Sequence, residues 1–172
     1  MTALRDLHDL SATELVAAYA RRELSPVEVT TAVLVHIDRW EPSLCATWAM
    51  DPEGALGMAR AAEARWLRGE PVGPVDGVPT MLKENIATRG VAVPLGTAAT
   101  ELAPAAVDAP PAARLREAGA VFLGKTTMPD YGMLSSGLSS FHRLARNPWN
   151  LAMNPGGSSA GEIGRASCRE RV

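Results

Sequence analysis

The sequence predicts an α/β protein with a partly parallel sheet. Signals for the start of a helix recur along the chain, and short apolar runs alternate with the helices that they predict. This alternation of helices and short buried strands is typical of α/β folds. The composition agrees, because a chain of 172 residues that is 47% hydrophobic and 21% charged resembles one folded domain rather than a disordered or fibrous protein.

Four helices are predicted, most of them from a capping residue followed closely by proline or glutamate. The capping box of Ser11 and Glu14 is the clearest of these signals. The second helix should end at Glu41 and Pro42, because proline lacks the backbone N–H that the helix needs. The third should end before Gly69, since glycine suits the position after a helix. The predicted helices span residues 12–22, 26–40, 52–68 and 108–118.

Two strands and one long irregular segment complete the prediction. Residues 45–50 and the apolar run 120–123 are predicted as strands, and a turn-rich stretch leads into the apolar segment before Lys83. Residues 124–161 show no helical or strand periodicity. Irregular segments of this length in a compact domain are usually functional or disordered.

The charge, hydropathy and cysteine content exclude several classes of protein. A net charge of −2 gives no basic face for nucleic acid, and no apolar run is long enough to cross a membrane. The polar N-terminus does not resemble a secretion signal. Two cysteines cannot form a disulfide framework, and no cysteine or histidine set has zinc spacing. We therefore expect a cytoplasmic protein that acts on a small molecule, without a cofactor or metal.

Two short motifs match catalytic or binding patterns but lack the context that these patterns need. Residues 119–126 fit the phosphate-binding pattern G-x-x-x-x-G-K-[ST], yet the variable positions are apolar and predict a buried strand, not a loop of exposed amides. Residues 157–161 fit the nucleophile pattern G-x-S-x-G, but the two prolines before them exclude the central strand that this turn requires. Neither motif is expected to function.

Lys83 and the glycine–serine segment 156–159 can be interpreted in two ways. A lysine at the end of an apolar segment is most often a surface residue, and a glycine–serine segment is often a flexible linker. A lysine held away from water can instead act as a neutral general base, which needs a hydroxyl group nearby. The serines of 156–159 would supply that hydroxyl group.

Together these segments resemble the amidase signature family. The resemblance is specific because the motifs occur in the family's order and 75 residues separate Lys83 from Ser158, as in the family. It covers nearly all of residues 1–161. The segments that carry it are 76–86, 124–131, 147–150 and 155–161.

The resemblance implies both a fold and a mechanism. The fold is a mixed β-sheet surrounded by helices, of which this chain would hold an incomplete N-terminal part, residues 1–161. The mechanism is the hydrolysis of carboxamides by a Ser–cis-Ser–Lys triad. Lys83 would be the neutral base, Ser158 the bridging serine with a cis peptide bond, and Ser159 a support of the loop. Gly132 would present its backbone carbonyl group to the substrate.

The chain departs from the family pattern in three ways. The attacking serine of the family lies about two dozen residues beyond Ser158, and residues 162–172 instead resemble the translation of a sequencing adapter. We therefore expect a non-native tail and a chain that is inactive alone, because it lacks the nucleophile. Glu84 stands where relatives commonly have aspartate. Apolar faces without their usual partners predict poor solubility.

Two alternatives to an amidase for small carboxamides remain open. One is the glutaminase subunit of a tRNA-dependent amidotransferase, which shares these motifs and would bind partner subunits; for a stand-alone amidase the expected partner is a second copy of the chain, in a homodimer. The segment 129–133 favours the stand-alone amidase, because it is less like the corresponding segment of the glutaminase. The other alternative is a non-catalytic α/β module.

Overall fold

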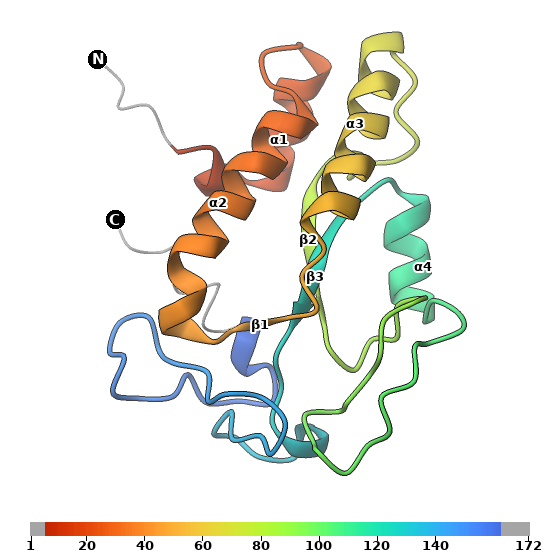
Figure 1. Cartoon of the computed structure of the whole chain (residues 1–172). Helices are drawn as coiled ribbons and strands as arrows, with labels where there is room; N and C mark the ends of the chain where they lie inside the picture. Colours follow the sequence, from red (N-terminus) through yellow and green to blue (C-terminus); the bar gives the residue numbers. More distant parts are fainter. Residues whose placement is uncertain (1–5, 163–172) are drawn as a thin grey trace. The chain divides into compact units, whose positions relative to one another are not determined.

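The structure, a computed structural model, describes residues 6–162, so the predicted non-native tail lies outside the described residues except for Glu162. It confirms the predicted α/β class. The helices and strands follow one another in the order η1 (Leu7–Asp9), α1 (Ala12–Ala20), α2 (Pro26–Leu44), β1 (Thr47–Trp48), α3 (Pro52–Arg68), β2 (Pro79–Lys83), α4 (Pro110–Glu117), β3 (Val121–Thr126) and η2 (Asp130–Gly132) (Figure 1).

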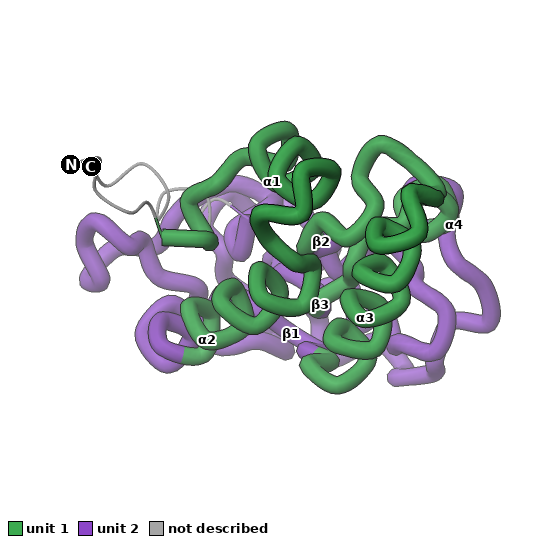
Figure 2. The backbone as a smooth tube through the Cα atoms, turned by 90° about the horizontal axis from the view of Figure 1, so that it is seen from above, with its two compact units in different colours: residues 1–38, 51–80, 113–123 green, residues 39–50, 81–112, 124–172 purple. Residues whose placement is uncertain are grey.

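The chain forms two compact units, each built from three separate segments (Figure 2). Unit 1 comprises residues 1–38, 51–80 and 113–123, and unit 2 comprises residues 39–50, 81–112 and 124–172. The strands β2 and β3 each begin in unit 1 and end in unit 2. Their first residues therefore belong to unit 1, and their last residues belong to unit 2.

Unit 1 is mainly helical and has an apolar core. The helix α3 contributes three alanines that are fully buried and lie three or four positions apart, so one narrow face of this helix packs closely. The Tyr19 hydroxyl group donates a hydrogen bond to the carbonyl oxygen of Gly77 at 3.3 Å, and burial raises the pKa of this tyrosine. Buried apolar residues of this unit include Leu15, Ala18, Tyr19, Val29, Val33, Ala55, Ala59, Ala62, Val121 and Leu123.

A buried ion pair fixes the turn before β2. The Asp76 carboxylate is fully buried and accepts hydrogen bonds from Arg65 Nε at 2.9 Å and Arg65 Nη2 at 2.5 Å. It also accepts one from the backbone N–H of Val72 at 3.0 Å. The hydrogen bond to Asp76 raises the pKa of the Arg65 guanidinium group. This pair holds the turn against α3.

The sheet has the strand order β1-β3-β2 and is mixed. The strands β1 and β3 are antiparallel, with Thr47 opposite Thr126. The strands β2 and β3 run in the same direction, because hydrogen bonds join their beginnings (Val121 N to Val78 O, 2.9 Å) and their ends (Glu84 N to Thr126 O, 3.1 Å). The predicted partly parallel sheet is confirmed.

The predicted end of the second helix at Pro42 is wrong. The helix α2 continues through this proline to Leu44. Pro42 lies in the last turn, where a missing N–H interrupts few hydrogen bonds. The Glu41 carboxylate accepts hydrogen bonds from the backbone N–H groups of Ala46 and Thr47 at 3.1–3.2 Å, which fixes the end of the helix.

The strand predictions need two further corrections. The strand predicted over residues 45–50 is only two residues long, because Cys45 (φ 49°) and Ala49 (φ 47°) adopt the left-handed conformation on either side of it. The strand predicted over residues 120–123 continues to Thr126, since Lys125 and Thr126 are buried despite their polar side chains. From residue 127 onward the described chain is largely irregular, as predicted. None of the helices in the described part is long and apolar enough to cross a membrane.

Candidate active site

Lys83 and Ser158 meet in unit 2, although 75 residues separate them in the sequence. The Lys83 Nζ atom donates a hydrogen bond to Ser158 Oγ at 3.3 Å. Lys83 is the last residue of β2 and is half-buried, whereas Ser158 is exposed in the irregular segment. The structure therefore brings together a lysine and a hydroxyl group, as a base and its proton donor require.

Backbone contacts on both sides hold the serine loop, residues 155–161. Before the serines, the N–H of Gly157 donates to the carbonyl oxygen of Ser135 at 2.9 Å. After them, the N–H of Gly161 donates to the carbonyl oxygen of Thr127 at 3.1 Å. A Cβ atom at Gly161 would lie 2.2 Å from the carbonyl oxygen of Ala46, so only glycine fits at this close approach.

Two further predicted site residues lie near this pair. Gly132 has a φ of 69°, and a Cβ atom built on it would lie 3.9 Å from the Cβ of Ser158. Gly132 therefore lies beside the bridging hydroxyl group that the family resemblance predicts. Ser159 is half-buried and directly precedes the helical residues 160–162.

The cis peptide bond expected at Ser158 is not present, and the described residues contain none. Gly156 (φ 74°) and Gly157 (φ 71°) adopt the left-handed conformation and make the sharp turn with trans bonds. A trans bond avoids the ~3–4 kcal/mol that a cis bond before a residue other than proline costs. This part of the expectation was wrong for the structure described.

A buried polar cluster lies behind the lysine, and the sequence patterns did not predict it. The Glu84 carboxylate is fully buried; its Oε1 accepts from the backbone N–H of Gly96, and its Oε2 accepts from His142 Nε2. The ammonium group of Lys125, which is 2% exposed, donates to the carbonyl oxygen of Ile86. The cluster joins the ends of two strands to the irregular segment.

The Lys125 ammonium group has an altered protonation equilibrium. Removal from water lowers its pKa from 10.5 to about 8, although the negative charges of Glu84 and Asp108 raise it in part. Lys125 belongs to the segment that matches the phosphate-binding pattern. Its strand conformation and its buried side chain confirm that this segment is not a phosphate loop.

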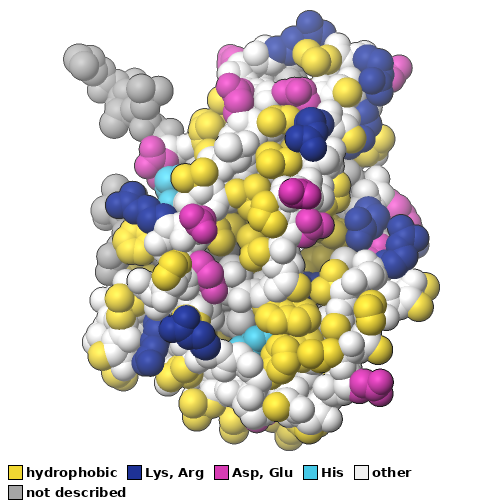
Figure 3. Space-filling model, viewed as in Figure 1, with side chains coloured by type: hydrophobic (Ala, Val, Ile, Leu, Met, Phe, Trp, Pro, Cys, Tyr) yellow, Lys and Arg dark blue, Asp and Glu magenta, His cyan; other side chains and the backbone are white. Residues whose placement is uncertain are grey.

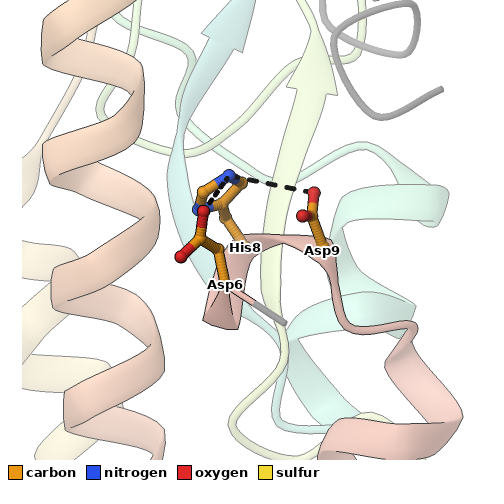
Figure 4. A group of neighbouring side chains, drawn as sticks. All are labelled: Asp6, His8 and Asp9. Atoms are coloured by element: carbon orange, nitrogen blue, oxygen red, sulfur yellow. Dashed lines mark ion pairs between the residues drawn. The ribbon is translucent and has the colours of Figure 1, made fainter. Parts of the chain in front are cut away.

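One group of side chains among residues 6–162 has ligand atoms close enough to hold a metal ion. In unit 1, His8 Nε2 lies 3.9 Å from Asp6 Oδ2 and 3.8 Å from Asp9 Oδ1 (Figure 4). The Asp6 side chain is 75% exposed, so water can solvate its charge. These distances are those of loose ion pairs at the surface, and we assign no ion to them.

Comparison with known proteins identifies the family of the chain. The family model for amidases matches residues 28–164, which is most of the chain. The chain belongs to the amidase signature family. The relatives include a glutamyl-tRNA(Gln) amidotransferase subunit from Methylococcus capsulatus, which is 39% identical over 163 residues, 95% of this chain and 33% of that protein.

Solved structures of the same family have the same fold. A bacterial aryl acylamidase of the amidase signature family superposes with a TM-score of 0.82 at 33% identity, over 90% of this chain and 32% of its own. The peptide amidase of Stenotrophomonas maltophilia superposes with a TM-score of 0.80 at 32% identity, over 92% of this chain and 33% of its own. The chain thus spans about a third of the length of the relatives that it matches.

Proposed function

We propose that the chain is the N-terminal part of an amidase that hydrolyses carboxamides, and that Lys83 and Ser158 are two members of its catalytic triad. The observation that carries this proposal is the hydrogen bond between Lys83 Nζ and Ser158 Oγ at 3.3 Å. Membership of a hydrolase family supports it. Residues 1–161 are the native portion of the domain in this proposal, and residues 162–172 are not part of it.

Each residue has one role in the proposed reaction. A neutral Lys83 takes the proton of Ser158, and Ser158 takes the proton of the attacking serine and later passes one to the leaving amine. The attacking serine and the oxyanion-hole amides lie outside this chain. The chain alone is therefore inactive, because neither the covalent intermediate nor its stabilisation is available. Gly132 contacts the substrate through its backbone, and Ser159 supports the loop.

A second candidate is the glutaminase subunit of a tRNA-dependent amidotransferase. Its support is the 39% identity to the glutamyl-tRNA(Gln) amidotransferase protein of Methylococcus capsulatus. In this role the protein would release ammonia from glutamine for a partner protein, whereas a stand-alone amidase would need no other protein. The support for the stand-alone role is the similarity to the solved structures of an aryl acylamidase and a peptide amidase, at 33% and 32% identity.

An activity assay tests the main proposal. The complete protein that carries this chain should release ammonia or amine from simple carboxamides. The variant Lys83→Ala should lose nearly all of this activity, because no other group takes the proton of Ser158. The matched control is Arg89→Ala, an exposed cation of the same unit that follows the same strand. Equal activity of Lys83→Ala and the wild type would refute the assignment.

The same preparation separates the two candidates. A stand-alone amidase turns over carboxamides in the absence of any other protein. The amidotransferase component would release ammonia from glutamine at an appreciable rate only with its partner subunits, and it would co-purify with them. Turnover of glutamine but of no other amide, and only when partner subunits are present, would favour the second candidate.

A further inference from the structure

Glu84 and Lys83 are neighbours in sequence but point in different directions. Along β2 and just beyond it, Leu82 and Glu84 are buried, whereas Met81 and Lys83 are half-buried. This alternation is the one that successive residues of a strand show. Because the two residues share a peptide bond, contacts that fix Glu84 also restrict the backbone that presents Lys83 to Ser158.

The carboxylate of Glu84 is fixed by groups from other segments of unit 2. The N–H of Gly96 donates to one oxygen, and Nε2 of His142 donates to the other. The side chain of His142 is only 5% exposed, and that of Glu84 is fully buried. A buried carboxylate without such partners would be strongly unfavourable, so these contacts fix its position.

The imidazole ring of His142 is itself fixed by its surroundings. It packs edge-to-face against Trp48, with ring centroids 5.9 Å apart, and against Phe141 at 4.9 Å. Its backbone N–H donates to Ser139 Oγ at 2.8 Å, and Ser139 Oγ donates to the carbonyl oxygen of Gly96. The segment 139–142 is thus bound at several points to the segment that follows Lys83.

We propose that His142 is a positioning residue of the amidase site: by donating a hydrogen bond to Glu84, it fixes the end of β2 that presents Lys83 to Ser158. This inference rests on the proposed function. In this inference His142, which lies in the irregular segment, helps to position the amine of Lys83. His142 does not itself contact Lys83 or Ser158 in the proposed reaction. The role needs an N–H donor at the position of Nε2 and a carboxylate at Glu84.

The chain offers a direct test because it contains only two lysines, Lys83 and Lys125. Acetic anhydride acetylates each lysine at a rate that depends on its contacts, and mass spectrometry of the digested protein reports the two rates separately. The experiment uses the 172-residue chain at low concentration, in buffer and in urea, so that each rate is compared with that of the unfolded chain.

Three variants give distinct expected results. In His142→Phe, which keeps an aromatic ring but no donor, Lys83 should react roughly fivefold faster than in the wild type, the effect of losing one hydrogen bond. In His142→Gln, whose amide N–H can reach the position of Nε2, the rate of Lys83 should return to that of the wild type. The control His36→Phe changes a histidine of unit 1 and should leave Lys83 unchanged.

A further variant keeps the test decisive if His142→Phe does not fold. Glu84→Leu keeps a side chain of similar size but removes both acceptor oxygens, so neither the contact with Gly96 nor the contact with His142 can form. It should accelerate Lys83 as His142→Phe does. An unchanged Lys83 rate in both variants, or no rescue by glutamine, would overturn the positioning role.

The serine variant separates this inference from the proposed function. Ser158→Ala should accelerate Lys83 and leave Lys125 protected. If Ser158→Ala has no effect, the contact between Lys83 and Ser158 is absent and both proposals fail. If Ser158→Ala has the expected effect and His142→Phe and Glu84→Leu do not, only the positioning role fails. Wild-type lysines that react as fast as in urea would also contradict both.

Discussion

The two units are stabilised by different kinds of contact. Unit 1 has regular helices, an apolar core and one buried ion pair. Unit 2 has long irregular segments, and its buried groups include Glu84, Lys125 and several threonines. In unit 2, polar contacts hold the loops in place. A helix or strand needs fewer such contacts, because its own backbone N–H and C=O groups form hydrogen bonds with one another. The proposed catalytic groups lie in unit 2, where loops can present them to a substrate.

The largest stability effect should come from the ion pair of unit 1. Asp76→Ala leaves the partly buried Arg65 without its partner and should lower the free energy of unfolding by about 3 kcal/mol. Urea denaturation at low protein concentration measures this. Glu70→Ala, which removes an exposed partner of Arg68, is the control and should leave the midpoint unchanged. A similar midpoint for both variants would show that unit 1 does not depend on its buried pair.

The next effect concerns the pH dependence of unit 2. The pKa of Lys125 is about 8 in the folded chain, whereas the ordinary pKa of a lysine is 10.5. At pH values between these two pKa values, the unfolded chain therefore binds more protons than the folded chain. The free energy of unfolding should therefore rise with pH, by roughly 2 kcal/mol between about pH 7.5 and 9.5. Below about pH 8 the contribution of Lys125 levels off.

The variant Lys125→Met should abolish this rise, and Arg89→Met, which replaces an exposed cation of the same unit, should retain it. Urea denaturation at three pH values across the window measures the slope for each protein. Equal slopes in the wild type and Lys125→Met would mean that another group titrates there. This result would mean that the burial of Lys125 does not set the pH dependence of unit 2.

A smaller effect tests the local stability of the first helix in unit 1. The Ser11 Oγ atom accepts from the N–H of Glu14 at 3.3 Å, and the Glu14 carboxylate accepts from the N–H of Ser11 at 2.7 Å. Ser11→Ala should destabilise the chain by about 1 kcal/mol. Arg60→Ala, which changes an exposed residue in the middle of α3, is the control with a much smaller expected change. Equal loss in both would mean that the cap does not support α1.

Surface substitutions in unit 2 should change solubility and leave stability nearly unaltered. Large apolar side chains reach the surface of the chain (Figure 3). Exposed patches of this kind favour association. The chain should therefore self-associate. Replacing two of the exposed apolar residues of unit 2 by serine should reduce light scattering, and Val35→Ser of unit 1 is the control. The exposed large apolar residues of unit 2 between residues 131 and 153 are Tyr131, Met133, Leu134, Leu138, Trp149, Leu151 and Met153.

The sequence predicted the regular elements of unit 1 well because their signals are local. The capping box at Ser11 is present, and Gly69 adopts the left-handed conformation directly after α3. Pro42 misled the prediction because a proline in the last helical turn can be tolerated when a neighbouring side chain fixes the end. Local sequence patterns thus predict the presence of a helix better than they predict its exact ends.

The site of unit 2 was predicted only in part. The meeting of Lys83 and Ser158 was expected from the family motifs, since periodicity says nothing about residues 75 positions apart. The contact of Glu84 with His142 and that of Lys125 with Ile86 were missed because they join segments far apart in the sequence. No local pattern distinguished Lys125 from a surface lysine, because a lysine at the end of an apolar segment is most often exposed.

The most direct test of the account compares the two adjacent serines in the complete protein. Ser158→Ala and Ser159→Ala remove the same hydroxyl group one residue apart, and the rate of carboxamide hydrolysis is measured for each against the wild type. The account predicts that Ser158→Ala lowers kcat by about 10³-fold or more, as expected for a member of a catalytic triad, while Ser159→Ala keeps most of the activity. Full activity in Ser158→Ala would contradict the assignment of Lys83 and Ser158 as a catalytic pair.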